Sequence, residues 1–425
     1  MKSGRCLAIA CYGLLAPSLL FAAECPEGER SRPVAEIVFE GNEVTRRETL
    51  TRELAFGPGD PVCPADLQRG RQALLDLRLF REVNWHEEAT EDGGLRVVYS
   101  VRERWYFLPV PRVDANSDAT FGLGVSLNWN NVGGRNHRLS MSAVRRELEE
   151  RTLDDETIVS AAYNWRRFGG TRTNITLRGS DSRESAVDGD SRFQDREMSF
   201  GVGASRQLTS HQTGQGWALD GGLDWVRGSN RGREAPPDEG VLVAPSIGLS
   251  YTDLHSSVYS ERGFTARIAM SASVPELSDY DQTRFGGAVL HIQPIGERAH
   301  QRLHLRASAG SFHGGPSQRR SDTFQLGGAS NLRGYDNEFG EGDVFWTVGA
   351  EYLRPVGWEW LRVLAVLEAG QVHRASCPDR DPGFMASIGL GFRVRFTWFV
   401  DAEIELGVAY PLRGGDGLRG FAGGV

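Results

Sequence analysis

The sequence predicts a mainly β fold, in which an antiparallel transmembrane β-barrel of about sixteen strands follows one small α+β domain. Strict alternation of apolar and polar residues recurs through residues 104–425, and in 344–352 it places Thr347, Gly349 and Glu351 on the polar face. Residues 104–425 also divide into about sixteen segments of roughly twenty residues, enough for a membrane-crossing strand and its connection. Both observations favour a barrel over a soluble antiparallel sheet with one wet face.

The composition agrees with a barrel. Mean hydropathy is −0.38, as expected when half of every strand faces water. After residue 23, no run approaches the roughly eighteen apolar residues that predict a membrane-spanning helix. The 52 glycines recur inside alternating segments, which favours a strongly curved sheet. The net charge of −8 gives no nucleic-acid signature, so no nucleic-acid partner is predicted.

The first 23 residues predict a cleaved secretory signal. Lys2 and Arg5 precede an apolar run from Leu7 to Ala23, and cleavage is expected after Ala23. Export to an oxidising compartment would allow Cys25 and Cys63 to form a disulfide. The alternative is that the two cysteines remain free thiols. No cysteine spacing indicates a metal or redox site.

Residues 33–103 predict a compact domain of order β-α-α-β-β. A strand over 34–40 ends at the turn Gly41-Asn42, and Thr45 with Glu48 predicts a capped helix over 46–55. A second helix begins at Pro64 or Asp66 and carries an apolar stripe. Strands over 83–88 and 95–102 complete the domain.

Residues 104–425 predict the barrel. Alternation is clear in segments 122–129, 197–204, 217–225, 264–271 and 387–396, each with apolar residues on one face. Tryptophans near the predicted strand ends suit aromatic girdles at the membrane surfaces, and they are Trp105, Trp129, Trp165, Trp358, Trp360 and Trp398.

The first and last predicted strands would meet at a weak seam. Pro109 and Pro111 lie in the first strand, over 105–114, and cannot donate ladder hydrogen bonds. The last strand, over 417–425, is short and glycine-rich, with Gly420 and Gly423 among its glycines. The alternative is a truncated or poorly made C-terminus.

A glycine-rich segment ending in Asn331, Leu332, Arg333, Gly334 and Tyr335 stands between two alternating strands, so it is expected to fold back into the barrel. A guanidinium inside the lumen requires charged partners, because an unpaired buried charge is costly. Alternation turns these partners toward the lumen: Glu368, Asp401, Glu403, Glu405 and Arg393. A bidentate Arg333–Glu368 pair would lock the loop, and which residue of 401, 403 and 405 shares Arg333 stays open.

These motifs carry a family resemblance. Leu332-Arg333-Gly334-Tyr335, Leu367-Glu368-Ala369-Gly370, the strand at 387–391, the segment 130–136 and Arg262-Gly263-Phe264 resemble the superfamily of BamA, TamA and the two-partner secretion transporters. Phe-Glu-Gly-Asn at 39–42 and Leu-Phe-Arg-Glu-Val at 79–83 resemble a polypeptide-transport-associated (POTRA) domain.

The resemblance implies a location in the bacterial outer membrane, with the POTRA domain in the periplasm, the arginine loop inside the lumen and a seam that opens toward lipid. The chain departs from the family in carrying a single POTRA domain and in lacking an aromatic residue at its end. The single domain favours an auxiliary or specialised role over that of the central insertase.

The leading functional hypothesis is therefore a factor that inserts polypeptides into the outer membrane or moves them across it. Its expected partners are the lipid bilayer, unfolded or secreted polypeptide clients and a periplasmic partner at the POTRA domain. The alternative is a plugged pore or surface antigen without insertase activity. An enzyme is not predicted, because the nine histidines are scattered and no Gly-x-Ser-x-Gly motif occurs. No cofactor or metal is predicted.

Overall fold

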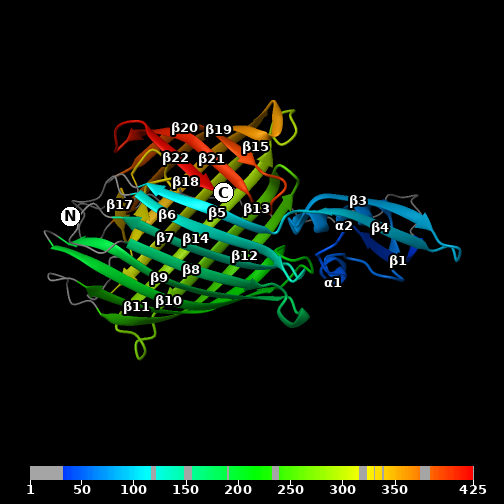
Figure 1. Cartoon of the computed structure of the whole chain (residues 1–425), viewed down its shortest axis with the longest axis horizontal. Coiled ribbons are helices and arrows are strands. Elements are labelled where there is room, and N and C mark those ends of the chain that lie inside the picture. The colour runs from blue at the N-terminus through cyan, green and yellow to red at the C-terminus, as the bar shows by residue number, and fades with distance from the viewer. Residues whose placement is uncertain are drawn as a thin grey trace, which may run out of the picture.

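The computed structural model describes residues 32–115, 121–147, 156–188, 191–231, 239–314, 323–329, 331–336, 339–373 and 383–424. These residues form a small N-terminal domain and a large curved sheet, which lie end to end along the molecule (Figure 1). The predicted signal peptide, residues 1–23, lies outside the described residues and stays a prediction. In the described ranges, no helix has the length and apolarity needed to cross a membrane.

The N-terminal domain packs two helices on a four-stranded sheet of order β2-β1-β4-β3. Strand β1 runs parallel to β4, whereas β3 runs antiparallel to it. The predicted β-α-α-β-β order is confirmed, with a two-residue strand added between the helices. The elements are β1 (Arg32–Glu40), α1 (Arg47–Thr51), β2 (Pro61–Val62), α2 (Pro64–Asp76), β3 (Phe80–Ala89) and β4 (Leu95–Glu103).

Helix α2 supplies the predicted apolar stripe. Leu67 and Leu74 are fully buried against the sheet, where they join Val83, Val97 and Tyr99 in one core. The helix begins at Pro64, a position where the missing N–H has no intrahelical partner to lose. Val400 from the β20–β21 turn of the barrel packs into the same core, so the domain and the barrel share apolar contacts.

Helix α1 differs from its prediction. It spans only Arg47–Thr51, and Thr45 does not cap it, so the expected capped helix over 46–55 is wrong. The Thr45 hydroxyl instead lies 3.1 Å from the Tyr106 hydroxyl and accepts a hydrogen bond from Asn131 Nδ2 at 2.8 Å. A buried contact with the barrel has therefore overridden a local capping signal.

Cys63 takes part in a disulfide bond. Cys25 lies outside the described residues, so the Cys25–Cys63 pair stays a prediction.

The barrel is one antiparallel sheet of sixteen strands, which confirms the predicted fold class. Its strands follow chain order, except that a separate β16–β17 pair intervenes between β15 and β18. They are β5 (Phe107–Ala115), β6 (Phe121–Val132), β7 (His137–Glu147), β8 (Glu156–Trp165), β9 (Thr173–Asp188), β10 (Ser191–Gln207), β11 (Gly216–Arg231), β12 (Gly240–Ser256), β13 (Glu261–Ala272), β14 (Gln282–Pro294), β15 (Arg302–Gly314), β18 (Val344–Val356), β19 (Trp358–His373), β20 (Met385–Arg395), β21 (Glu403–Arg413) and β22 (Arg419–Gly424).

The apolar face of the sheet points outward. Leu123, Ile268 and Leu390 are each about 60% exposed, as side chains that meet lipid must be. The six tryptophans predicted at strand ends are also exposed, and all of them lie at the end that faces the N-terminal domain. They form one girdle rather than two, and this girdle marks one membrane surface.

The N-terminal domain is anchored to the turns at that end of the barrel. Arg46 N–H donates to the Gly134 carbonyl at 2.9 Å, and the Thr49 hydroxyl donates to the same oxygen at 2.8 Å. A Cβ on Gly134 would lie 2.1 Å from the Val44 carbonyl oxygen, so this close approach requires glycine. The buried Glu53 carboxylate accepts the Thr213 N–H at 2.6 Å in the β10–β11 turn.

Candidate functional site

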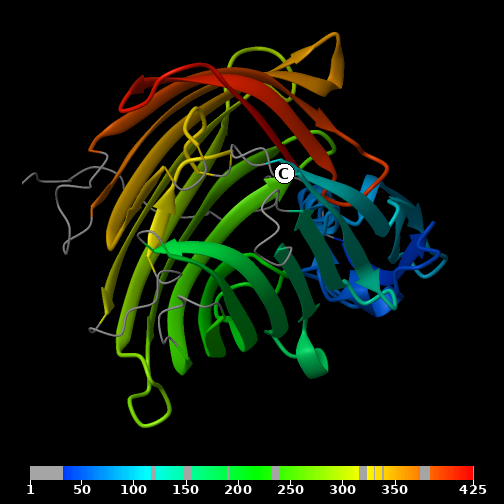
Figure 2. The same cartoon turned by 60° about the vertical axis from the view of Figure 1, so that its left-hand side comes forward.

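The described residues between β15 and β18 lie inside the barrel instead of continuing the wall. The short strands β16 (Phe324–Leu326) and β17 (Gly340–Gly342) pair with each other, and between them lies the arginine loop, described at residues 327–329, 331–336 and 339. Figure 2 shows this region, in yellow, on the concave side of the sheet beneath β18–β22. Leu332 and Tyr335 are buried, so the tip of the loop is packed against the inner wall.

Arg333 is held by carboxylates from three different strands. Its Nη1 donates to Glu368 Oε1 of β19 at 2.6 Å, and its Nη2 donates to Glu351 Oε1 of β18 at 2.8 Å. The same Nη2 lies 2.9 Å from Glu405 Oε1 of β21. The backbone N–H of Arg333 also donates to Glu368 Oε2 at 2.7 Å.

Two further arginines complete the cluster. Arg393 of β20 lies 2.8 Å from Glu351 and also forms an ion pair with Glu405. Arg306 of β15 contacts Glu368 and lies 3.6 Å from Glu351. Three guanidinium groups therefore face three carboxylates, and their formal charges cancel. Except for the half-buried Arg306, these side chains are at most 6% exposed. Balanced charge and short hydrogen bonds are the conditions under which buried ions are tolerated.

Phe421 of the last strand covers the arginine. Its ring centre lies 5.3 Å from the Arg333 Cζ, within the range of a cation–π contact. Phe421 is buried and packs with Leu353, Leu364 and Ala409 on the inner wall. The end of the barrel is therefore in contact with the loop.

Only some of the partners predicted from the sequence contact Arg333. Glu368 and Glu405 contact Arg333, but the Glu368 contact divides between side chain and backbone, so it is not the bidentate guanidinium pair expected. Asp401 does not line a strand, because β21 begins at Glu403 and Asp401 lies in the preceding turn. Glu403 binds Arg362 at 3.2 Å and Arg395 at 2.9 Å instead of Arg333.

Glu351 and Arg306 were not predicted as members of the cluster. Alternation had already placed Glu351 on the polar face of its strand, and Glu351 and Arg306 lie on adjacent strands of the sheet. The alternation of polar and apolar residues is therefore enough to predict that these side chains point into the lumen. It does not predict that they contact Arg333 and its partners.

A second line of ion pairs connects the wall to the N-terminal domain. Arg395 lies 3.3 Å from Glu261, and Glu261 lies 2.8 Å from Arg78 at the end of α2. Arg78 lies 3.4 Å from Asp401. This second line ends at the barrel mouth, where the N-terminal domain sits.

Tyr335 fills an irregularity in the wall. The β20–β21 register shifts between Ala386, which faces Arg413, and Ser387, which faces Pro411. The Tyr335 hydroxyl accepts the Ala386 N–H at 2.8 Å and contacts the carbonyl oxygens of Ala386 and Arg413. The loop therefore completes hydrogen bonds that the ladder omits at this β-bulge.

Replacing Tyr335 with phenylalanine should lower the free energy of unfolding by about 1–3 kcal/mol, because the Ala386 N–H loses its acceptor inside the wall. The measurement is urea unfolding in micelles, followed by tryptophan fluorescence. Tyr410→Phe is the matched control, since Tyr410 is half-exposed on the outer face. Equal effects of the two variants would contradict a structural role for the Tyr335 hydroxyl.

The seam is the open edge between β5 and β22. These are the two end strands of the sheet, and in the described residues neither pairs with the other. The start of the first strand is instead tied to the β20–β21 turn, where Trp105 N–H donates to the Trp398 carbonyl at 2.6 Å.

The two seam prolines withhold donors from this open edge. Asn130 N–H donates to the Tyr106 carbonyl at 2.7 Å, which makes residues 106 and 130 a hydrogen-bonded pair. Such pairs alternate along an antiparallel ladder, so even-numbered residues of β5 bond to β6 and odd-numbered residues face outward along the edge. Pro109 and Pro111 are odd-numbered. The ladder with β6 is therefore intact, and the seam edge loses two donors.

The other side of the seam is short. Strand β22 has six residues, and a Cβ at Gly423 would meet no atom within 4 Å. At Gly420, the nearest atom to such a Cβ is 4.0 Å away. Steric space does not explain these glycines, and their effect is a strand with few side chains to hold it.

Within the described residues, no group of three or more His, Cys, Asp or Glu side chains is placed to hold a metal ion. The site consists of an ion-paired loop and an unpaired edge.

Comparisons with known proteins fit this arrangement. Residues 131–421 match the Omp85 superfamily domain, and residues 33–104 match POTRA, described as the surface antigen variable number repeat. No curated protein sequence matches the chain.

Several solved structures share the fold. CdiB from Escherichia coli has a TM-score of 0.65 at 17% identity, covering 92% of this chain and 76% of that one. CdiB from Acinetobacter baumannii has a TM-score of 0.63 at 16% identity, with 92% and 73% covered. BamA from Haemophilus ducreyi lacking POTRA domains 1–3 has a TM-score of 0.56 at 14% identity, with 92% and 83% covered.

At these identities the solved structures establish the fold alone. The sequence match over 131–421 goes further, because it spans more than half of the chain and includes the arginine loop and all three of its glutamates. The protein therefore belongs to the Omp85 superfamily, with a region that matches the POTRA family directly before the barrel.

Proposed function

We propose that the protein inserts polypeptides into the bacterial outer membrane or moves them across it, with its POTRA domain in the periplasm. The observation that carries this proposal is the seam. Opening the barrel between any other two neighbouring strands breaks a continuous ladder of hydrogen bonds. Between β5 and β22 the edges are unpaired and two donors are missing, so the free-energy cost of opening is lowest there.

The arginine loop gives this seam one firm side. Arg333 joins β18, β19 and β21, and Tyr335 joins β20 to β21, so the loop braces the wall that ends at β22. No such brace reaches β5 in the described residues. A client strand entering the seam would meet a fixed wall on one side and a movable strand on the other. Client folding and burial would supply the energy.

The second candidate is a plugged pore. The burial of Leu332 and Tyr335 inside the barrel favours it, because a plug needs the same packing. The two functions differ in whether the protein accelerates the folding of another barrel.

The proposal is tested by reconstituting the mature protein in liposomes and measuring the folding rate of an unfolded client barrel, with protein-free liposomes as the baseline. Acceleration is expected. The double variant Pro109→Thr and Pro111→Thr adds two N–H donors to the seam edge, so it should close the seam and return the rate toward the baseline.

The matched control for the seam variant is Leu108→Thr with Val110→Thr, whose N–H groups already bond to β6, and it should keep the parent rate. Absence of acceleration by the parent, together with ion conductance, would establish the plugged pore instead. Acceleration that the proline variant leaves unchanged would remove the seam from the mechanism.

A further inference from the structure

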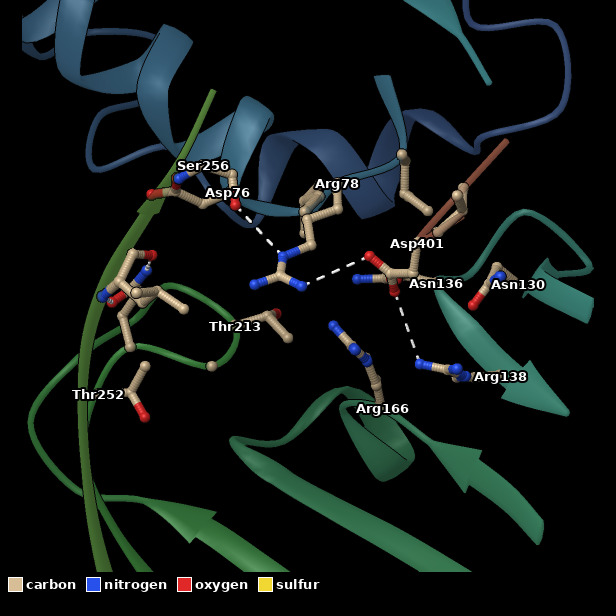
Figure 3. A pocket seen from close by; sticks show the side chains of 16 residues that line it. Asp76, Arg78, Asn130, Asn136, Arg138, Arg166, Thr213, Thr252, Ser256 and Asp401 are labelled. Carbon is tan, nitrogen blue, oxygen red and sulfur yellow. Dashed lines mark hydrogen bonds and ion pairs between the residues drawn. The ribbon is translucent and has the colours of Figure 1, made fainter. Parts of the chain in front are cut away.

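A polar cavity of about 220 Å³ lies where the N-terminal domain meets the barrel mouth. Figure 3 shows its lining, which comes from the end of α2, the segment after it, and the turns and ends of β6, β7 and β12 that face this domain. The segment 130–136, which the sequence analysis singled out by resemblance, contributes Asn130 and Asn136 to it. The arginine loop and the seam do not line this cavity.

The lining of the cavity contains three arginines, Arg78, Arg138 and Arg166, and two carboxylates, Asp76 and Asp401. Its two carboxylates are already engaged: Asp76 accepts the Ser256 N–H at 2.7 Å and lies 2.9 Å from the His255 ring. Asp401 is shared by Arg78 at 3.4 Å and Arg138 at 3.6 Å. Arg78 is also paired with Glu261 at 2.8 Å, whereas in the described residues Asp401 is the one carboxylate within ion-pair distance of Arg138.

Arg166 adds a third guanidinium with no acceptor. It follows β8 in the turn, and in the described residues its side chain makes no hydrogen bond or ion pair within 4.0 Å. Figure 3 shows it directed into the cavity between Arg78 and Arg138. Burial and the neighbouring positive charges of Arg138 and Arg78 lower the pKa of Arg166, against the opposing effect of Asp401.

Asn136 provides an independent indication. The residue is only 4% exposed, and its Nδ2 has no hydrogen-bond partner in the described part of the chain. In Figure 3 this amide points to the same space as Arg166. A buried donor without an acceptor is destabilising, and an anionic ligand that accepts from it would relieve that cost.

We propose that this cavity is a binding site for a carboxylate group of a client polypeptide, held by Arg166, Asn136 and Arg138. A planar guanidinium matches a carboxylate in geometry as well as charge. This inference rests on the proposed function, since it assigns the carboxylate to a chain that enters between the N-terminal domain and the barrel.

The position of the cavity favours a polypeptide over a lipid headgroup. Its walls are the end of α2, the segment after it, and turns and strand ends at the mouth of the barrel, whereas the girdle tryptophans are exposed on the outer face. A volume of about 220 Å³ equals the liquid volume of roughly seven waters, which suits one acidic side chain or a chain terminus.

The experiment measures binding of a fluorescent Gly-Ser peptide with a single Glu to the full-length mature protein in nanodiscs, beside the same peptide with Gln. The Glu peptide should bind about tenfold tighter, as expected for a charge-assisted hydrogen bond, and the preference should weaken as salt rises. Arg166→Gln should abolish the preference. Arg172→Gln, an exposed arginine in the same turn that does not line the cavity, should retain it.

Equal binding of the two peptides to the parent, or a preference that Arg166→Gln leaves intact, would overturn the proposal. Displacement of the Glu peptide by inorganic phosphate but not by acetate at equal concentration would reassign the site to phosphate and also overturn it. Binding is measured without client folding. A Glu preference in a protein that does not accelerate folding would therefore support the cavity while rejecting the proposed function.

Discussion

Replacing Arg333 with alanine is expected to abolish the acceleration of client folding while the barrel still inserts into membranes. The substitution leaves Glu351, Glu368 and Glu405 buried against only Arg306 and Arg393. Removing one partner from a buried ionic cluster lowers stability by about 3–5 kcal/mol. The loop can escape this penalty by leaving the wall, which takes the brace from β18, β19 and β21.

The measurement is the folding rate of an unfolded client barrel in liposomes, normalised to the amount of inserted protein. Arg196→Ala is the matched control, because Arg196 pairs with Asp181 in the same barrel but both side chains are over one-third exposed. Such an exposed pair contributes about 0–1 kcal/mol, so this variant should behave as the parent does. Full acceleration by the Arg333 variant at normal abundance would refute the loop mechanism.

The Glu368→Gln substitution is expected to release the loop while keeping the arginine. Glu368 is 1% exposed and accepts the backbone N–H of Arg333, the Arg333 guanidinium and Arg306. A neutral amide leaves two guanidinium groups under-compensated, and a destabilisation of about 3–5 kcal/mol is expected. The released loop should then become accessible to trypsin at Arg333, which is 5% exposed in the parent.

Limited trypsin digestion with mass spectrometry detects this cut directly. Glu359→Gln on the same strand is the control, because Glu359 is exposed, and it should leave Arg333 protected. A Glu368 variant as resistant as the parent would show that the remaining contacts hold the loop without this carboxylate. The assay reports loop position, so it separates release of the loop from a loss of activity with another cause.

The alternation of polar and apolar residues along single strands was enough to predict the barrel and the direction of its lumen side chains. The direction of Glu368 and Glu405 followed from it, because successive residues of a strand point to opposite faces. The seam prolines could be recognised as donors withheld from a ladder. Which edge they face could not, since that depends on the hydrogen-bonding phase of β5 against β6.

The errors arise where contacts between distant segments decide. Thr45 looked like a helix cap, but Tyr106 and Asn131 take its hydroxyl at the domain junction. Asp401 looked like a strand residue because its neighbours alternate, whereas its φ of 47° places it in a turn. The cavity around Arg166 gave no local signal, because its residues meet only when the two parts of the chain dock.

The hydrogen bonds from Arg46 and Thr49 to Gly134 couple movements of the N-terminal domain mechanically to the barrel. Gly134 lies in the turn that ends β6, and β6 is the ladder neighbour of the seam strand β5. A force applied to the domain is therefore transmitted through that turn to β6 and from there to β5 at the seam. The domain is also tied to the β20–β21 turn through Arg78 and Asp401, so tension in a captured client would act on the turns at both sides of the seam.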